Sequence, residues 1–65
     1  MEIKIARIKK GLTQMELCKR VKTSPRKIVQ IERGDLGKVS FELAKRIAIE
    51  LDSSINELFL NEEGQ

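Results

Sequence analysis

The stretch TSPRKIVQIERG, residues 23–34, carries the side chains best suited to recognising another molecule. Its two isoleucines, Ile28 and Ile31, are three residues apart and are expected to face a core if the stretch is helical. Each residue of an α-helix advances by about 100°, so these two residues define the rotation of the others. The residues that this rotation turns outward are Arg26, Val29, Gln30 and Arg33.

These outward residue types suit the edges of DNA base pairs. Arginine can make two hydrogen bonds to guanine, glutamine can do the same to adenine, and a valine side chain can contact the methyl group of thymine. A solvated helix more often carries Glu and Lys in i,i+4 pairs, whereas no acidic residue occurs from Pro25 to Gln30. An ordinary polar face remains the alternative interpretation.

The composition excludes several other kinds of chemistry. Among 65 residues there is no histidine and one cysteine, Cys18, so neither a zinc site nor an internal disulfide is expected. We interpret Cys18 as a small core residue rather than a redox sensor. No nucleophile stands beside a base, so we expect no enzyme activity, no cofactor, no metal and no small-molecule ligand.

The location is expected to be the cytoplasm. No stretch approaches the ~20 apolar residues of a membrane helix. The first ten residues, MEIKIARIKK, have charges within every apolar run and do not resemble a signal peptide. A free thiol also suits a reducing compartment. We therefore expect no membrane partner.

The charge is unevenly distributed along the chain. Residues 1–38 hold eleven Lys and Arg against four Asp and Glu, a net +7, whereas residues 39–65 hold two against six, a net −4. A basic half favours a polyanion, and nucleic acid is the commonest polyanion in a cytoplasm. A solvated surface that is merely lopsided is the alternative.

The pattern of caps and apolar residues predicts an all-α fold with five helices. Thr13, Ser24, Ser40 and Ser54 are the expected N-caps, and a glutamate three residues after Thr13 and Ser54 completes two capping boxes. We expect residues 1–60 to form one domain and residues 61–65 to form a polar tail. The residues expected on the buried face of the fourth helix are Phe41, Ala44, Ile47, Ala48 and Leu51.

The second and third helices are separated by only about three residues, Val21 to Thr23. So short a link forces the helices into a corner, and a corner with basic residues on its second helix is typical of a helix-turn-helix. The same rotation turns Glu32 nearly inward, where a carboxylate needs a partner. We expect Arg7 to be that partner; the alternative is that Glu32 extends to solvent.

The segment GLTQMELCKRVKTSPRKIVQIERG, residues 11–34, resembles the helix-turn-helix of XRE/Cro-type regulators, the group of small phage repressors and Cro proteins. The resemblance continues through SFELAKRIAIELDSSINELF and covers residues 1 to about 60. It implies a five-helix repressor-like domain that binds double-stranded DNA, with the third helix in the major groove. It also implies a nucleoid-associated protein that is encoded by a bacterium or a phage. By position, it implies base-reading roles for Ser24, Pro25, Arg26, Lys27 and Gln30, to which the rotation adds Val29.

The resemblance also implies that Gln14 contacts a DNA phosphate and braces the third helix, and that Arg7 pairs with Glu32. The residues expected to contact phosphate are Lys9, Lys10, Thr13, Gln14, Arg33 and Lys38. Departures from the family pattern include Lys22 at the turn and Asp52 after the fourth helix, each at a place where glycine is usual. Lys22 is therefore expected to adopt a left-handed conformation.

One helix-turn-helix reads a short half-site, so we expect a homodimer on a palindromic operator, acting as a repressor. The expected dimer contacts at the acidic, apolar end are Ile55, Leu58, Phe59 and Leu60, with Phe59 and Leu60 preferred. For Ile55 and Leu58, a place in the core of the monomer is an equal alternative. A second hypothesis for the whole chain is a protein-binding module on the same fold, similar to an antitoxin or an anti-repressor.

Overall fold

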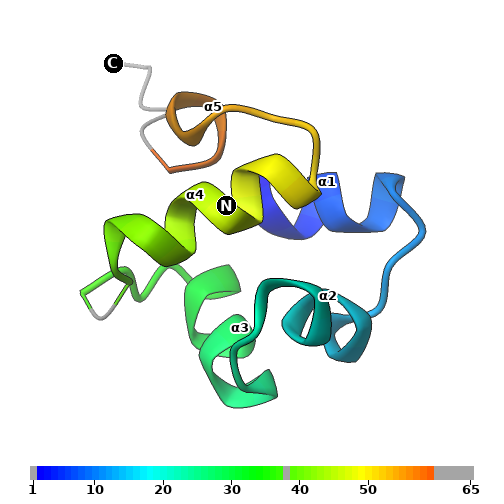
Figure 1. Cartoon of the computed structure of the whole chain (residues 1–65), viewed down its shortest axis with the longest axis horizontal. Coiled ribbons are helices and arrows are strands. Elements are labelled where there is room, and N and C mark those ends of the chain that lie inside the picture. The colour runs from blue at the N-terminus through cyan, green and yellow to red at the C-terminus, as the bar shows by residue number, and fades with distance from the viewer. Residues whose placement is uncertain (1, 38, 60–65) are drawn as a thin grey trace.

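The computed structural model describes residues 2–37 and 39–59, and this part of the chain contains helices and no strand. The helices are α1 (Glu2–Lys9), α2 (Gln14–Val21), α3 (Pro25–Glu32), α4 (Phe41–Glu50) and α5 (Ile55–Phe59) (Figure 1). The predicted all-α class with five helices is confirmed. Lys38, Leu60 and the expected tail lie outside the described residues.

Side-chain caps begin the helices at the predicted residues. The hydroxyls of Thr13, Ser24 and Ser40 each accept the backbone N–H three residues later, at 3.0, 3.2 and 3.0 Å. Ser54 accepts the backbone N–H of Glu57 at 3.0 Å. The glutamates after Thr13 and Ser54 accept the cap's own backbone N–H in turn, so both predicted capping boxes are present. Local sequence therefore determines where these helices begin.

Two non-glycine residues end helices in the left-handed conformation. Lys22 follows α2 with φ 61° and Asp52 follows α4 with φ 56°, the two positions where the family pattern has glycine. The backbone N–H of the next residue, Thr23 or Ser53, donates to the carbonyl five residues earlier at 2.9 Å. The left-handed conformation costs a non-glycine residue ~1–2 kcal/mol, so contacts with the rest of the fold must stabilise each of these two turns.

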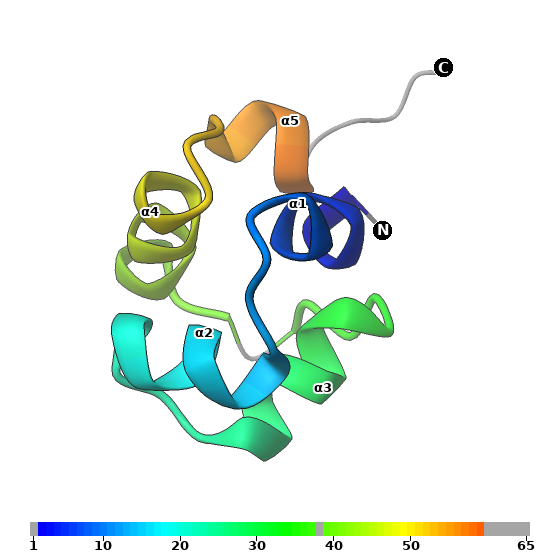
Figure 2. The same cartoon turned by 90° about the vertical axis from the view of Figure 1, so that its right-hand side faces the viewer.

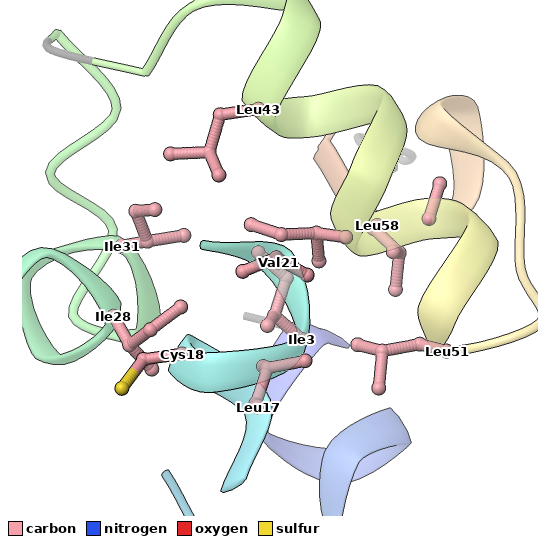
Figure 3. Close-up of a cluster of buried hydrophobic side chains, with 11 residues drawn as sticks. Ile3, Leu17, Cys18, Val21, Ile28, Ile31, Leu43, Leu51 and Leu58 are labelled. Atoms are coloured by element: carbon pink, nitrogen blue, oxygen red, sulfur yellow. The ribbon is translucent and has the colours of Figure 1, made fainter. Parts of the chain in front are cut away.

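An aliphatic core lies between the helices (Figure 3). α2 packs against both α3 and α4, and α5 packs against α1 and α4. Cys18, only 2% exposed, occupies this core as an ordinary small side chain. The buried members of the cluster are Ile3, Leu17, Cys18, Val21, Ile28, Ile31, Leu43, Ile47, Ala48, Leu51 and Leu58.

The prediction that Phe41 faces the core is wrong. Phe41 is 70% exposed, whereas Leu43 is 8% exposed and belongs to the core. The two residues are about 160° apart around α4, so they stand at opposite edges of its apolar stripe. The structure turns the Leu43 edge inward, to the side of the cluster where Ile31 lies (Figure 3). The Phe41 ring instead has the Lys45 ammonium 5.6 Å from its centroid.

Candidate nucleic-acid interface

α2 and α3 meet at a tight corner. α2 ends at Val21 and α3 begins at Pro25, so only residues 22–24 join them. Lys22 adopts the left-handed conformation and Ser24 then caps α3. Figure 2 shows the two helices together at one end of the molecule, with α5 at the other end. The predicted helix-turn-helix arrangement is therefore present.

The outward face of α3 has the rotation that its two isoleucines predict. Both isoleucines are fully buried, which leaves Arg26 and Arg33 exposed. Val29 and Gln30 are half-buried at the edge of this face. Within residues 2–37 and 39–59, neither Arg26 nor Arg33 forms an ion pair. Both guanidinium groups therefore have hydrogen-bond donors available to an external acceptor.

The first turn of α3 places the remaining expected base-reading residues beside this face. Ser24 and Pro25 are exposed, and Lys27 is half-buried. The Ser24 hydroxyl accepts the backbone N–H of Lys27, so this hydroxyl is already partly engaged as the cap. Pro25 has no backbone N–H, so it offers an external partner no donor. The donors of this region thus come mainly from Arg26, Lys27 and Gln30.

A buried polar network joins α1 and α3 to the start of α2. Arg7 is 8% exposed, and its Nε donates to Glu32 Oε2 at 2.6 Å while Nη2 donates to Oε1 at 3.3 Å. The Glu32 side chain is 5% exposed, so it does not extend to solvent. Arg7 Nη1 donates to the Leu12 carbonyl at 2.8 Å. Arg7 is therefore the partner of Glu32 in this structure.

Gln14, the first residue of α2, belongs to the same network. Its Nε2 donates to Glu32 Oε1 at 3.0 Å, and the residue is half-buried. An amide nitrogen carries two hydrogens, so one contact with Glu32 leaves a second donor. Glu32 thus fixes the Gln14 side chain against the end of α3.

Comparison with known proteins identifies the family. A family model described as helix-turn-helix matches residues 3–58. The chain belongs to the XRE/Cro-type helix-turn-helix family. It is therefore a DNA-binding regulator, and α3 is the second helix of its helix-turn-helix, the one known in this motif as the recognition helix. Among curated proteins and among solved structures, no significant match was found.

The start of α2 in this helix-turn-helix protein is stabilised by its capping box. Thr13 is exposed, and its backbone N–H donates to Glu16 Oε1 at 2.8 Å. This hydrogen bond holds the pKa of Glu16 below its ordinary value. Desolvation acts in the opposite direction, while the Thr13 hydroxyl and the charges of Arg20 and Lys19 add to the lowering of the pKa. The box therefore keeps Glu16 ionised.

Lys9 and Lys10 are not brought together with the start of the recognition helix. Both residues are exposed, and Lys10 Nζ lies 3.7 Å from Asp52 Oδ2. Figures 1 and 2 both place the end of α1 beside the turn between α4 and α5, whereas α3 begins at the opposite end of the molecule. Lys38 lies outside the described residues.

The expected dimer contacts are only partly available at the surface. Leu58 is 2% exposed and belongs to the monomer core. Of its two predicted roles, the structure shows the place in the core, and a residue with so little exposed surface is not available as a dimer contact. Ile55 and Phe59 are half-buried against the core. Leu60 lies outside the described residues.

Sequence reasoning missed the contacts by which α4 holds α2. Arg46 Nη1 donates to the Val21 carbonyl at 2.9 Å, and Arg20 Nη1 lies 2.9 Å from Glu50 Oε2. These partners are 25 and 30 residues apart in the chain. No local pattern indicates such contacts, because they depend on how α4 packs across α2.

A membrane-spanning helix and a metal-binding cluster are both absent from the described residues. No helix in the described part is long and apolar enough to cross a membrane. The same residues contain no group of three or more His, Cys, Asp or Glu side chains that could hold a metal ion.

Proposed function

We propose that this protein is a transcriptional repressor that binds a palindromic operator as a homodimer, with one α3 in each of two major grooves. The outward face of α3 is the observation that carries the proposal. Arg26 is exposed, no acidic residue lies nearby in the first turns of the helix, and two buried isoleucines prevent the helix from rotating. The base-reading residues would be Ser24, Pro25, Arg26, Lys27, Val29 and Gln30.

The phosphate contacts would surround this face. Thr13 caps α2, Gln14 is the first residue of α2, and Arg33 follows the last residue of α3. Lys38 comes five residues later in the sequence. We propose these four as direct phosphate contacts. Their positive charges and N–H donors would supply affinity and salt dependence without reading sequence. Lys9 and Lys10, at the end of α1, would contribute through the longer-range field of the basic half.

We take residues 1–60 as the domain and residues 61–65 as a tail. The dimer would form through the C-terminal end of this domain. Phe59 is half-buried in the monomer, so part of its ring remains accessible to a second copy. Ile55 shares this property, and Leu60 would extend the same surface. A dimer doubles the number of bases read, which a short half-site requires for useful specificity.

The alternative is a protein-binding module whose DNA face is secondary. That reading predicts that the donors of the recognition helix are occupied within the chain. In the described residues Arg26 forms no ion pair, and the side-chain amide of Gln30 makes no hydrogen bond. These observations favour DNA over a protein partner as the principal ligand of α3.

Selection from a pool of random-sequence duplexes tests the function directly. We expect the wild-type protein to enrich a palindromic sequence, with an affinity that falls steeply between two salt concentrations. Arg26→Ala should lose discrimination at one base position by about 1–3 kcal/mol. Lys4→Ala is the matched control, because Lys4 is an exposed cation on α1, outside the proposed interface. This control should keep the base preference of the wild type.

The dimer is tested with Phe59→Glu on the enriched sequence. This variant should bind an isolated half-site as the wild type does and lose the extra affinity for the full palindrome. Failure of the wild-type protein to enrich any sequence, together with an affinity independent of salt, would rule out the proposed function.

A further inference from the structure

Arg46 reaches from α4 to the corner of the helix-turn-helix. Its Nη1 donates to the carbonyl of Val21 at 2.9 Å. Val21 is the last residue of α2 and is 1% exposed, so this carbonyl lies where solvent access is limited. The contact therefore joins α4 to the point at which the chain turns from α2 into α3.

The carbonyl of Val21 needs this donor because the backbone does not supply one. In a continuing helix, the N–H four residues later would donate to it. That residue is Pro25, which has no N–H. The N–H groups of Lys22 and Thr23 donate instead to carbonyls earlier in α2. Because α2 ends at Val21, its carbonyl is one of the last-turn groups that no backbone N–H reaches, and Arg46 supplies the hydrogen bond from its side chain.

Two glutamates of α4 stand one turn before and one turn after Arg46, and the first of them pairs with it. Glu42, one turn earlier on α4, has Oε2 3.7 Å from Arg46 Nε. Glu50, one turn later, pairs with Arg20 in the last turn of α2 at 2.9 Å. Two successive turns of α4 therefore bind the end of α2, and the hydrogen bond from Arg46 is made at the corner itself.

We propose that Arg46 is a positioning residue for DNA recognition: it holds the Val21 carbonyl and thereby sets the angle at which α3 meets the major groove. The role in recognition rests on the proposed function. Lys22 is a non-glycine residue in a sterically unfavourable conformation at this corner, so the corner depends on contacts from outside. Base contacts tolerate displacements of only about 0.5 Å, so a small rotation at the corner misplaces the outward side chains of α3.

Two substitutions with the same change of charge separate positioning from electrostatics. Arg46→Met removes the donor and keeps the aliphatic stem, whereas Lys45→Met removes an equal charge from the adjacent, exposed position of α4. Affinities are measured for the palindrome that the wild type enriches and for a scrambled duplex of the same length, at two salt concentrations. Selectivity is the ratio of the two affinities.

We expect Arg46→Met to reduce selectivity about tenfold, because a hydrogen bond from a charged donor is lost. Arg46→Lys, which keeps the charge and one donor, should reduce selectivity about threefold with the salt slope of the wild type. Lys45→Met should leave selectivity unchanged. The inference fails if Arg46→Met alters selectivity no more than Lys45→Met. If Arg46→Met does not fold, wild-type selectivity in Arg46→Lys overturns the inference.

A measurement without DNA keeps this test separate from the proposed function. Residual dipolar couplings of the backbone amides report the angle between α2 and α3 in the free protein. We expect this angle to change, or to average over a wider range, in Arg46→Met and Arg46→Lys relative to Lys45→Met. An unchanged angle in both Arg46 variants would overturn the positioning role, whether or not the wild-type protein selects a DNA sequence.

Discussion

Two ion pairs of the same residue types join helices in this protein, and they differ mainly in burial. Arg7 and Glu32 connect α1 to α3 at 2.6 Å, with side chains 9% and 5% exposed. Arg20 and Glu50 connect α2 to α4 at 2.9 Å, with side chains 57% and 28% exposed. The distances are similar, so the surroundings rather than the geometry must decide what each pair contributes.

The difference follows from the dielectric environment of each pair. Water screens the charges of an exposed pair, and ordering two long side chains offsets much of what remains. A buried pair has little water to replace a lost partner, so removing one member leaves an uncompensated charge. Removing one partner of the buried α1–α3 pair is therefore costly, although the intact pair adds little to the net free energy of unfolding.

The largest effect is expected from Arg7→Met, which leaves the buried carboxylate of Glu32 without its cation. We expect a loss of about 3–5 kcal/mol in the free energy of unfolding. A domain of this size has a total stability of only a few kcal/mol, so the variant should be largely unfolded at 25 °C. Urea titration followed by circular dichroism measures the change. A loss below about 1 kcal/mol would contradict the role assigned to burial.

The matched control for this variant is the double substitution Arg7→Met with Glu32→Leu. No charge is then left in the buried site, so we expect much of the lost stability to return. If the double variant is no more stable than Arg7→Met alone, then packing rather than the unpaired charge accounts for the damage.

A smaller effect is expected from Gln14→Ala, which removes a neutral donor from the same buried carboxylate. Glu32 keeps Arg7 as its partner, so we expect a loss of about 1–2 kcal/mol in the free energy of unfolding. Met15→Ala, at an exposed neighbouring position, should cost less and serves as the control. Equal losses in the two variants would show that the network does not depend on Gln14.

Arg20→Met is expected to cost less than about 1 kcal/mol, although it breaks an ion pair with a similar distance. The cost should shrink further as the salt concentration rises, because screening weakens the exposed pair of the wild type. Thermal unfolding at low and high salt provides the measurement. A loss as large as that of Arg7→Met would remove the contrast between the two pairs.

The smallest effect is expected from Glu16, whose capping-box carboxylate is fully solvent-accessible. Its pKa in the folded state is lowered, chiefly by the hydrogen bond from the Thr13 backbone, so ionisation favours folding. This contribution is complete above the ordinary pKa of a glutamate and disappears as the pH falls through the lowered value. The stability difference between wild type and Glu16→Gln should therefore be present near neutral pH and vanish in acid. A difference independent of pH would contradict this assignment.

The contact between Arg7 and Glu32 could be anticipated, whereas the contact of Arg46 could not. The helical period turned Glu32 inward. A buried carboxylate requires a cation, so the candidate partners of Glu32 were limited to a few basic residues. Arg46 binds a backbone carbonyl instead, and every residue has one, so side-chain types gave no indication of this partner. The contact forms because α2 ends at Val21 and α4 is packed across the corner, which brings Arg46 to a carbonyl without a backbone donor.

The assignments of Phe41 and Leu58 show the same limit. Periodicity placed Phe41 on the buried face of the fourth helix, whereas the structure buries Leu43 at the opposite edge of the same stripe. It also left Leu58 with two interpretations, the core of the monomer or a dimer contact. Both choices depend on which neighbouring helix lies against the residue, and that neighbour is distant in the chain.

By itself, the sequence determined the helices, their caps, a corner of about three residues, which it placed one residue too early, and the rotation of α3. These depend on interactions within a few residues, chiefly hydrogen bonds of the caps and the regular advance of the helix. Only the tertiary structure decided which edge of α4 is buried, that Lys10 lies beside Asp52, and that Arg46 serves the α2–α3 corner. Such contacts bring together groups far apart in the chain, and the packing of whole helices selects them.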